Sequence, residues 1–308
     1  MQHIRDLKEV KLDRSWLTIG SFDGVHLGHQ QIIQTLVTGA KQAGVPSVVV
    51  TFFPHPQFVL RGESRPYYLT LPEKRAQLLA ELGVDYVFTF PFDERISQLS
   101  AREFISNLHE DFRFKELLIG YDFALGKDRE GDSDLLQEIG GDLGYSVRVI
   151  PPFKVAEKLV SSSLIRSMIR EGDVRLANTL LGREFSISGQ VIKGDDRGKS
   201  LGFATCNLDV HSEVVNIKSG VYASKGLVSG KLWPAVTNIG FRPTFGEDLS
   251  LPRIEAHLLD FSGNLYGQDV ELLFVDRLRD EIKFSLVDDL IDQIKQDVRK
   301  TRRILGQE

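Results

Sequence analysis

Cysteine is nearly missing from the 308-residue sequence, which contains only Cys206. One cysteine cannot form an intrachain disulfide, so the sequence excludes a small secreted fold held together by disulfides. No apolar run approaches the roughly 20 residues that a membrane-spanning helix requires. Residues 1–14 also lack the apolar core of a signal peptide. We therefore expect a cytoplasmic protein without a membrane partner.

An excess of basic residues is missing as well. Lys and Arg number 38 against 43 Asp and Glu, which gives a formal net charge of -5. A general nucleic-acid binder usually contains a basic domain, so we expect no nucleic-acid partner. Hydrophobic residues make up 42% and charged residues 26%, as in ordinary globular proteins. The length suits two domains, each with its own core.

The pattern of apolar residues changes near residue 183. Before that point, short apolar runs alternate with amphipathic stretches. Capping-box patterns pair Thr70 with Glu73 and Ser100 with Glu103, and each pair predicts a helix start. Alternating strands and helices predict a parallel sheet with right-handed crossovers, hence an α/β, Rossmann-like domain over residues 1–182. Its strands are predicted at residues 16–20, 45–53, 84–90, 117–120 and 146–150.

The second part, residues 183–308, has a different pattern. Short runs with alternating apolar residues are separated by glycine turns, which predicts an antiparallel β-barrel or sandwich. A final amphipathic helix is expected to begin near Ser285. Its apolar face is predicted to consist of Leu286, Leu290, Ile291 and Ile294.

A glycine-rich turn joins the first predicted strand to the first predicted helix. Gly20, Gly24 and Gly28 would let the backbone approach a phosphate, at the strand end where ligands bind in such sheets. His26 and His29 lie three residues apart at a helix start, and both can donate to phosphate oxygens there. Turn glycines with surface histidines are the plain alternative. A zinc site is a weaker one, because no cysteine or third histidine nearby completes a ligand set.

The segment GSFDGVHLGH, residues 20–29, resembles the HxGH signature of the nucleotidylyltransferase superfamily, and its FDG prefix resembles the FAD synthetase branch. Residues 161–166, SSSLIR, resemble the second ATP motif of that superfamily. The resemblance implies that His26 and His29 are catalytic and contact the ATP phosphates. It further implies an ATP-binding set that consists of Gly20, Phe22, Asp23, Gly24, Gly28, Ser161, Ser162, Ser163 and Arg166.

Two further segments are similar to the same branch. FFPHP at residues 52–56 resembles its FxPHP loop, and GYDFALG at residues 120–126 resembles its GxDFxFG motif, with leucine in place of the second aromatic residue. The resemblance implies that His55, Asp122 and Phe123 bind flavin in the adenylyltransferase site. A surface histidine and a core phenylalanine remain the alternatives.

A second glycine-rich loop, residues 193–207, lies in the β-rich part and suits a loop that covers a phosphate. It resembles the riboflavin kinase motif GRxLGFPTAN, except for Ala204 and Cys206. Cys206 is expected to be a small packed side chain. The resemblance implies Mg²⁺ ligation by Thr205 and Asn207, whose oxygens are of the kind Mg²⁺ accepts. It also implies that the kinase ATP contacts are Gly194, Gly198, Lys199, Gly202, Thr205 and Asn207.

Three downstream segments also resemble riboflavin kinases. They are NIGFRPTFG at residues 238–246, IEAHLLDF at 254–261 and LRDEIKF at 278–284. The resemblance implies that Glu255 is the catalytic base for the riboflavin hydroxyl and that Arg279 binds flavin. A solvent-facing glutamate in a strand of period two is the alternative.

Together the motifs resemble the bacterial bifunctional riboflavin kinase/FMN adenylyltransferase family along nearly the whole chain. This resemblance implies phosphorylation of riboflavin to FMN and adenylylation of FMN to FAD, with ATP as co-substrate, Mg²⁺ as cofactor and a monomer or weak homo-oligomer. One alternative is a nucleotidylyltransferase alone, acting on another phosphate such as pantetheine phosphate. The other is a flavin-sensing regulator with slow turnover, which the changes at Ala204 and Cys206 favour.

Overall fold

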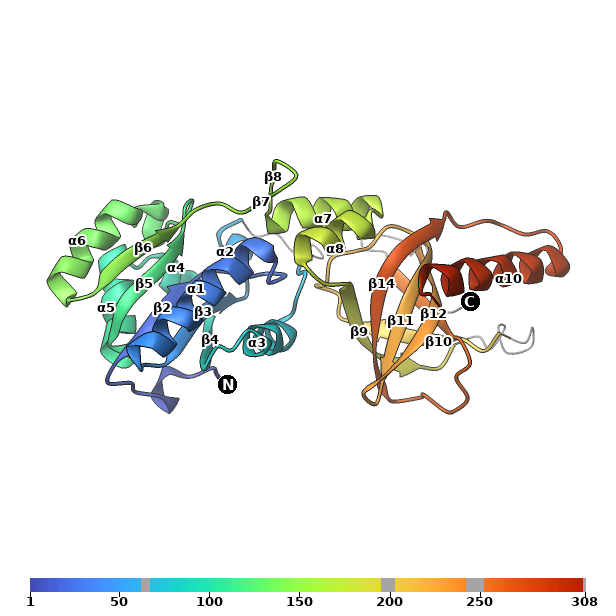
Figure 1. The fold of residues 1–308 in the computed structure, drawn as a ribbon, viewed down its shortest axis with the longest axis horizontal. Helices are drawn as coiled ribbons and strands as arrows, with labels where there is room; N and C mark the ends of the chain where they lie inside the picture. Colours follow the sequence, from blue (N-terminus) through green and yellow to red (C-terminus); the bar gives the residue numbers. More distant parts are fainter. Residues whose placement is uncertain (62–66, 195–202, 242–251, 307–308) are drawn as a thin grey trace. The chain divides into compact units, whose positions relative to one another are not determined.

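The computed structural model describes residues 1–61, 67–194, 203–241 and 252–306. Contacts between Cα atoms divide the chain into two units, Met1–Ser162 and Ser163–Glu308, and each is described by itself (Figure 1). The boundary that the change of sequence pattern predicts between residues 182 and 183 stays a prediction.

The first unit contains a six-stranded sheet in the order β1-β4-β3-β2-β5-β6, in which all neighbouring strands run parallel. The five strands predicted from the sequence are confirmed. The edge strand β1 was not predicted, because three residues carry too little periodicity. The strands are β1 (Gln2–Ile4), β2 (Ser15–Ile19), β3 (Ser47–Phe53), β4 (Tyr86–Pro91), β5 (Phe114–Gly120) and β6 (Ser146–Ile150).

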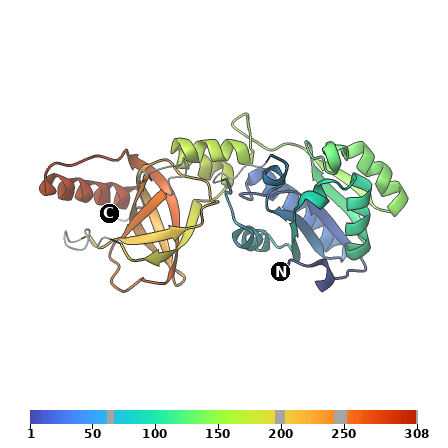
Figure 2. The same ribbon diagram turned by 180° about the vertical axis from the view of Figure 1, so that it is seen from behind.

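Helices cover both faces of this sheet (Figures 1 and 2). Leu36 and Leu79 anchor α1 and α3 in one apolar cluster, while Leu108 and Ile139 anchor α5 and α6 in the cluster on the other face. This doubly wound arrangement confirms the predicted Rossmann-like fold. The helices are α1 (Leu27–Ala43), α2 (Pro56–Arg61), α3 (Pro72–Glu81), α4 (Glu94–Ser97), α5 (Ala101–Phe112) and α6 (Ser133–Leu143), and a short hairpin follows with strands β7 (Lys154–Val155) and β8 (Lys158–Leu159).

One of the two predicted capping boxes is confirmed. Ser100 caps α5 together with Glu103, each side chain bonding the other residue's backbone N–H. The Thr70–Glu73 prediction is wrong, because α3 begins at Pro72 and has Leu71 at its N-cap position without a side-chain bond. Proline suits the first position of a helix, since its φ angle is already helical. The Thr70 hydroxyl instead bonds to the loop after β2.

The second unit begins within α7 (Ser162–Glu171), continues with α8 (Val174–Leu181) and then forms a closed antiparallel barrel in the order β10-β13-β12-β11-β14-β9. The structure thus decides between the predicted barrel and sandwich in favour of the barrel. The strands are β9 (Phe185–Ile192), β10 (Cys206–Val210), β11 (Gly220–Val228), β12 (Lys231–Phe241), β13 (Pro252–Leu258) and β14 (Asp269–Arg279), and the last helix is α10 (Val287–Ile304).

Helix α10 packs against the outside of the barrel at β11 and β12 (Figure 1). The prediction of Leu286 on its apolar face is wrong, because Leu286 is the N-cap residue and is 64% exposed. The other three predicted apolar residues are half-buried. The fully buried positions of the helix are the polar residues Asp297 and Thr301. A polar contact, not only an apolar stripe, therefore anchors this helix.

Candidate active sites

The first candidate site is the loop between β2 and α1. Strand β2 lies between β3 and β5, so the chain leaves it at the point where the strand order reverses, which is the usual ligand crevice of such sheets. Phe22, Gly24 and Val25 all have positive φ angles, which fold the loop tightly. Helix α1 starts directly after it, so the N–H groups of its first turn lie at the same end of the sheet.

His26 and His29 are brought together as the sequence predicts. His26 is the N-cap of α1, and its Nδ1 accepts a hydrogen bond from the backbone N–H of His29 at 3.2 Å. The two imidazole rings stack with centroids 3.6 Å apart, and the ring of Phe22 meets His29 edge-on at 5.1 Å. Two imidazoles and a helix N-terminus at one place suit an anion whose charge increases during a reaction.

Asp23 is fully buried in this loop. Its carboxylate accepts hydrogen bonds from the backbone N–H groups of Leu69 and Thr70, at 2.9 to 3.1 Å. It also lies 3.8 Å from the guanidinium of Arg75, whose side chain is equally buried. The sequence pattern does not predict a role for Arg75, since an arginine within a helix gives no sign of its burial.

The serine-rich segment begins helix α7. The Ser162 hydroxyl donates to the backbone carbonyl of Asp23 at 2.9 Å, which ties this segment to the β2–α1 loop. Ser161 is half-buried beside it. Ser163 is exposed and Arg166, one turn farther along α7, is only 4% exposed. Both belong to the second unit, and their role with the histidines stays a prediction.

His55 lies at the carboxyl end of β3, within an aromatic cluster. Its backbone N–H donates to the Tyr68 hydroxyl at 2.7 Å, and its ring lies 5.1 Å from that of Tyr67. We call the rings of Phe53, His55, Phe58, Tyr67 and Tyr68 the β3-end aromatic cluster.

Asp122 and Phe123 follow β5, on the other side of β2. Asp122 is exposed, and its backbone carbonyl accepts from Nη2 of Arg129 at 3.1 Å. Phe123 is partly buried and packs against the apolar cluster of the α5 and α6 face. A partly buried ring can pack against this cluster and still contact a flavin. The flavin-binding role of Phe123 therefore stays a prediction.

The second candidate site lies on the outer surface of the barrel. Ile254, Ala256 and Leu258 of β13 are buried, so Glu255 between them points outward. In the strand register Glu255 is opposite Asn207 of β10 on one side and Asn238 of β12 on the other. Three polar side chains therefore form a row across three strands.

Arg253 is a further residue of this row, and no motif of the sequence predicts it. Its Nε atom lies 2.5 Å from Oε1 of Glu255 and 3.4 Å from Oδ1 of Asn207. A basic residue two positions before a glutamate in a strand lies on the same face. The spacing of Arg253 and Glu255 in the sequence is the signal that could identify Arg253 as part of this site.

The second glycine-rich loop, residues 193–207, starts close to the Asn207 side chain. A Cβ atom added to Gly194 would overlap the Asn207 amide, so a larger residue there would displace that side chain. Thr205 is exposed and Asn207 is half-buried. Gly198, Lys199 and Gly202 lie outside the described residues. Cys206 is buried, its thiol donates to the Ala256 carbonyl at 3.4 Å, and burial raises its pKa to about 11, as expected of a packed thiol.

Arg279 is held at the end of β14 by helix α10. Its Nε and Nη2 atoms bond the Asp297 carboxylate at 2.7 to 3.1 Å, and Gln293 donates to the same carboxylate at 3.0 Å. Its Nη1 atom donates to the Asp280 carbonyl at 2.9 Å. The predicted flavin contact would therefore come from a side chain that is already fixed in position.

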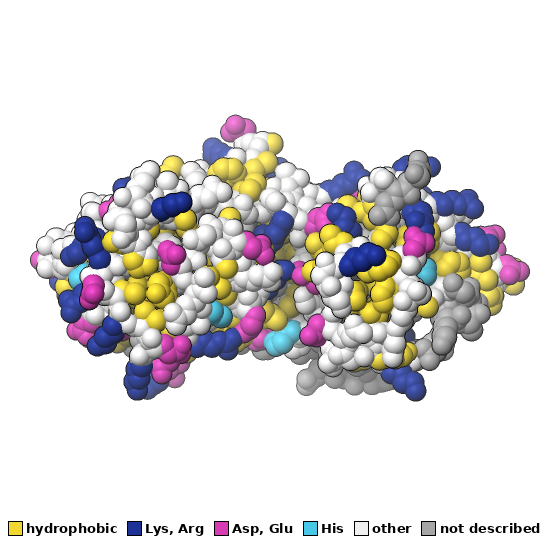
Figure 3. Space-filling view, turned by 60° about the horizontal axis from the view of Figure 1, so that its bottom comes forward, with side chains coloured by type: hydrophobic (Ala, Val, Ile, Leu, Met, Phe, Trp, Pro, Cys, Tyr) yellow, Lys and Arg dark blue, Asp and Glu magenta, His cyan; other side chains and the backbone are white. Residues whose placement is uncertain are grey.

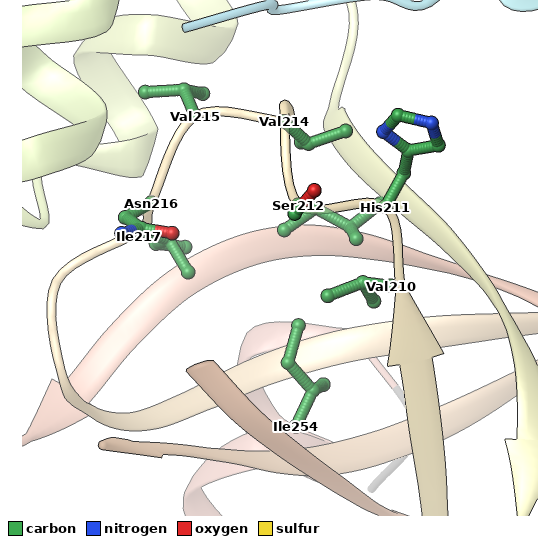
Figure 4. A pocket seen from close by; sticks show the side chains of 9 residues that line it. Val210, His211, Ser212, Val214, Val215, Asn216, Ile217 and Ile254 are labelled. Atoms are coloured by element: carbon green, nitrogen blue, oxygen red, sulfur yellow. The ribbon is translucent and has the colours of Figure 1, made fainter. Parts of the chain in front are cut away.

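A small pocket at one end of the barrel is separate from these residues. In Figure 4 the side chains of Val210, Val214 and Ile254 point toward one another, while the His211 ring points away from them. None of the predicted site residues lines it. The full lining is Ile187, Val210, His211, Ser212, Val214, Val215, Asn216, Ile217 and Ile254.

On the face shown in Figure 3, acidic and basic side chains are interspersed. Within the described ranges, no three His, Cys, Asp or Glu side chains gather as a metal ligand set. In the same part of the chain, no helix has the length and apolar character to cross a bilayer.

Comparison with known proteins assigns both parts of the chain. The FAD synthetase family model matches residues 8–164 and the riboflavin kinase model matches residues 181–305. The chain is 37% identical to the bifunctional riboflavin kinase/FMN adenylyltransferase of Escherichia coli K12 over 305 residues, which cover 98% of this chain and 96% of that protein. It is 34% identical to the protein of the same name from Bacillus subtilis over 304 residues, with the same coverage.

A solved structure has the same fold along the whole chain. It comes from a Streptococcus pneumoniae protein that is called a macrolide-efflux protein, with a TM-score of 0.89, 29% identity and 98% coverage of both chains. The two family models match consecutive parts of the chain, and the named relatives align over nearly all of it. The chain belongs to the bifunctional riboflavin kinase/FMN adenylyltransferase family.

Proposed function

We propose that the chain performs the two reactions of its family at two separate places. It phosphorylates riboflavin to FMN on the barrel around Glu255, and it adenylylates FMN to FAD at the β2–α1 loop. The observation that carries this assignment is the stacked pair of His26 and His29 at the N-terminus of α1, where phosphates bind favourably. The row of Asn207, Glu255 and Asn238 supports the kinase half.

In the adenylyltransferase reaction, a phosphate oxygen of FMN attacks the α-phosphorus of ATP. The bond to the β-phosphate breaks and pyrophosphate leaves, without a covalent enzyme intermediate. His26 and His29 donate to phosphate oxygens while charge builds on them. The residues that hold ATP are Gly20, Phe22, Gly24 and Gly28 in the loop, with Ser161, Ser162, Ser163 and Arg166 from the serine-rich segment.

The flavin of FMN lies on the other side of the same crevice. His55 and its neighbours in the β3-end aromatic cluster offer ring faces and edges, which suit a flat isoalloxazine. Asp122 and Phe123 approach from the end of β5. These strand ends flank β2 on its two sides, which supports a shared crevice.

In the kinase reaction, Glu255 accepts the proton of the ribityl 5′-hydroxyl while that oxygen attacks the γ-phosphorus of ATP. The bond between the γ-phosphorus and the β–γ bridging oxygen breaks, and ADP leaves. Such transfers depend mainly on positioning and on neutralising phosphate charge. Arg279, fixed by Asp297, contacts the flavin. Gly194, Gly198, Lys199 and Gly202 cover the ATP phosphates.

The residues around Asn207 also fit Mg²⁺. The Thr205 hydroxyl and the Asn207 carbonyl oxygen are hard donors of the kind that Mg²⁺ accepts, and the Asn207 oxygen also lies 3.4 Å from Nε of Arg253. When bound there with ATP, Mg²⁺ neutralises charge on the phosphates. Thr205 and Asn207 would hold the ion, and Glu255, which is not one of these proposed ligands, would take the substrate proton.

The single cysteine, which cannot form an intrachain disulfide, supports a cytoplasmic enzyme. The net charge of -5 supports small-molecule partners, namely riboflavin, FMN, FAD and ATP, and we propose no nucleic-acid or membrane partner. We further propose a monomer or weak homo-oligomer.

Riboflavin and FMN supplied separately, each with ATP and Mg²⁺, test the assignment. His29→Ala should lower FAD formation from FMN by roughly 100-fold or more and leave FMN formation intact. Glu255→Gln should show the reverse, with FMN formation lowered by roughly 100-fold or more. Equal loss of both activities in either variant would overturn the assignment of separate sites.

A further inference from the structure

Two charged side chains are buried together beneath the adenylyltransferase loop. Asp23 and Arg75 are both 0% exposed, and Nη2 of Arg75 lies 3.8 Å from Oδ1 of Asp23. Resting on the proposed function, we propose that this pair couples the binding of ATP to the binding of FMN. Asp23 and Arg75 are positioning residues in this account and do not touch either substrate.

Asp23 fixes the loop that carries the histidines. Its carboxylate accepts from the backbone N–H groups of Leu69 and Thr70, while its own backbone carbonyl accepts from Ser162. A carboxylate that is buried and hydrogen-bonded in this way is directed at the protein and away from the nucleotide. The family resemblance places Asp23 in the ATP-binding set. In this account Asp23 acts on ATP indirectly, because it holds the loop that binds the nucleotide.

Arg75 links that loop to the end of β3. Its Nη1 atom donates to the Thr51 hydroxyl at 2.9 Å and to the Phe52 carbonyl at 3.2 Å, and its Nη2 atom donates to the Thr70 carbonyl at 3.0 Å. The Thr51 hydroxyl in turn donates to the Ser21 carbonyl at 2.8 Å. One guanidinium thus joins two segments that flank the crevice.

The Thr70 hydroxyl connects the histidine loop most directly to the segment that contains Tyr67 and Tyr68. It accepts from the backbone N–H of Gly24 at 2.9 Å and donates to Asp23 at 3.3 Å. Gly24 lies in the histidine loop, while Tyr67 and Tyr68, just before Thr70, belong to the β3-end aromatic cluster. The ATP side and the flavin side of the crevice therefore share one buried network.

Coupling follows from the cost of disturbing such a network. Separating Asp23 from Arg75 would leave two buried charges without partners, which is unfavourable. The histidine loop and the β3-end aromatic cluster therefore adopt only those positions in which the pair stays formed. A substrate that orders one side then prepares the other side for its own ligand. Typical couplings of this kind are about 5-fold to 150-fold in affinity.

Initial rates of FAD formation, measured over a grid of FMN and ATP concentrations, give the coupling factor between the two substrates. We expect a factor of at least about 5 in the wild type. Thr70→Val removes the bridging hydroxyl and should bring the factor close to 1, whereas Thr70→Ser should retain it. Asp23→Asn should also lower it.

Ser15→Ala is the matched control, because it removes another buried hydroxyl of the same unit at the opposite end of β2, where Ser15 donates to the Phe112 carbonyl. It should keep the wild-type factor. FMN formation from riboflavin on the same chain reports that each variant is folded in its kinase part.

A wild-type factor of 1, an unchanged factor in Thr70→Val, or an equal loss in Ser15→Ala overturns the coupling. Should Asp23→Asn fail to fold, the Thr70 variants decide. Failure of the proposed function has a different signature, because His29→Ala would then form FAD at the wild-type rate.

Discussion

Nε of Arg253 lies 2.5 Å from Oε1 of Glu255 on the outer face of the barrel. Both side chains are about one-third exposed, so the pair remains accessible to a substrate. The same Nε atom approaches Oδ1 of Asn207 at 3.4 Å. Arg253 therefore orients the proposed base and one proposed metal ligand at once.

Replacing Arg253 with alanine should lower kcat for FMN formation by about tenfold, because Glu255 loses the charge-assisted bond that holds its orientation. FAD formation from supplied FMN should not change. Arg302→Ala is the control, since Arg302 pairs with Asp260 on another part of the barrel unit. Normal FMN formation by Arg253→Ala, or an equal loss in the control, would contradict the assigned role.

Gly39→Ala should destabilise the first unit. Gly39 lies in α1 directly against the ring of Trp16, and an added Cβ atom would overlap that ring. Overpacking of this kind costs roughly 1–3 kcal/mol in the free energy of unfolding. Denaturant unfolding measures the change.

The matched control for that variant is Gly141→Ala in α6, where an added Cβ meets nothing within 4 Å. Alanine there should be neutral or stabilise by about 0.4–1 kcal/mol. Equal effects of the two substitutions would show that the contact with Trp16 is not the cause.

His109 should make the first unit sensitive to acid. His109 is 8% exposed, and its ring packs with its centroid 4.9 Å from that of Phe114 and 6.0 Å from that of Tyr145. Burial, with smaller contributions from Lys115 and Arg113, lowers the pKa of His109 below its usual value. Protonation therefore favours the unfolded chain, where the pKa is about 6.5.

The stability that neutral His109 supports is complete above about pH 6.5 and is lost as the pH falls through the lowered folded-state pKa. His109→Gln cannot titrate, so the fall in melting temperature between pH 7.5 and pH 5 should be smaller in this variant. Thermal unfolding at a series of pH values measures it. A fall as steep as in the wild type would rule out His109 as the acid-sensitive group.

The sequence predicted those features that depend on local pattern. Hydrophobic runs located five of the six sheet strands, and the Ser100–Glu103 spacing located the start of α5. His26 and His29 are predicted to lie together, because side chains three positions apart at a helix start are on the same side of the helix. These predictions needed no knowledge of distant contacts.

Predictions failed or were missing where a distant residue decides. Thr70 has the spacing of a helix cap, yet its hydroxyl bonds to Asp23, 47 residues earlier. The burial of Arg75 and the pairing of Arg279 with Asp297 on α10 depend on how elements pack in three dimensions. Periodicity within one segment contains no information about such contacts.

The central claim is that two separate sets of residues carry the two reactions. Each variant, His29→Ala and Glu255→Gln, is incubated alone with riboflavin, ATP and Mg²⁺, and then the two are mixed, with FMN and FAD resolved by chromatography. His29→Ala alone should accumulate FMN, Glu255→Gln alone should form neither product, and the mixture should form FAD. A mixture that forms no FAD, or a Glu255→Gln variant that forms FMN at the normal rate, would contradict the account.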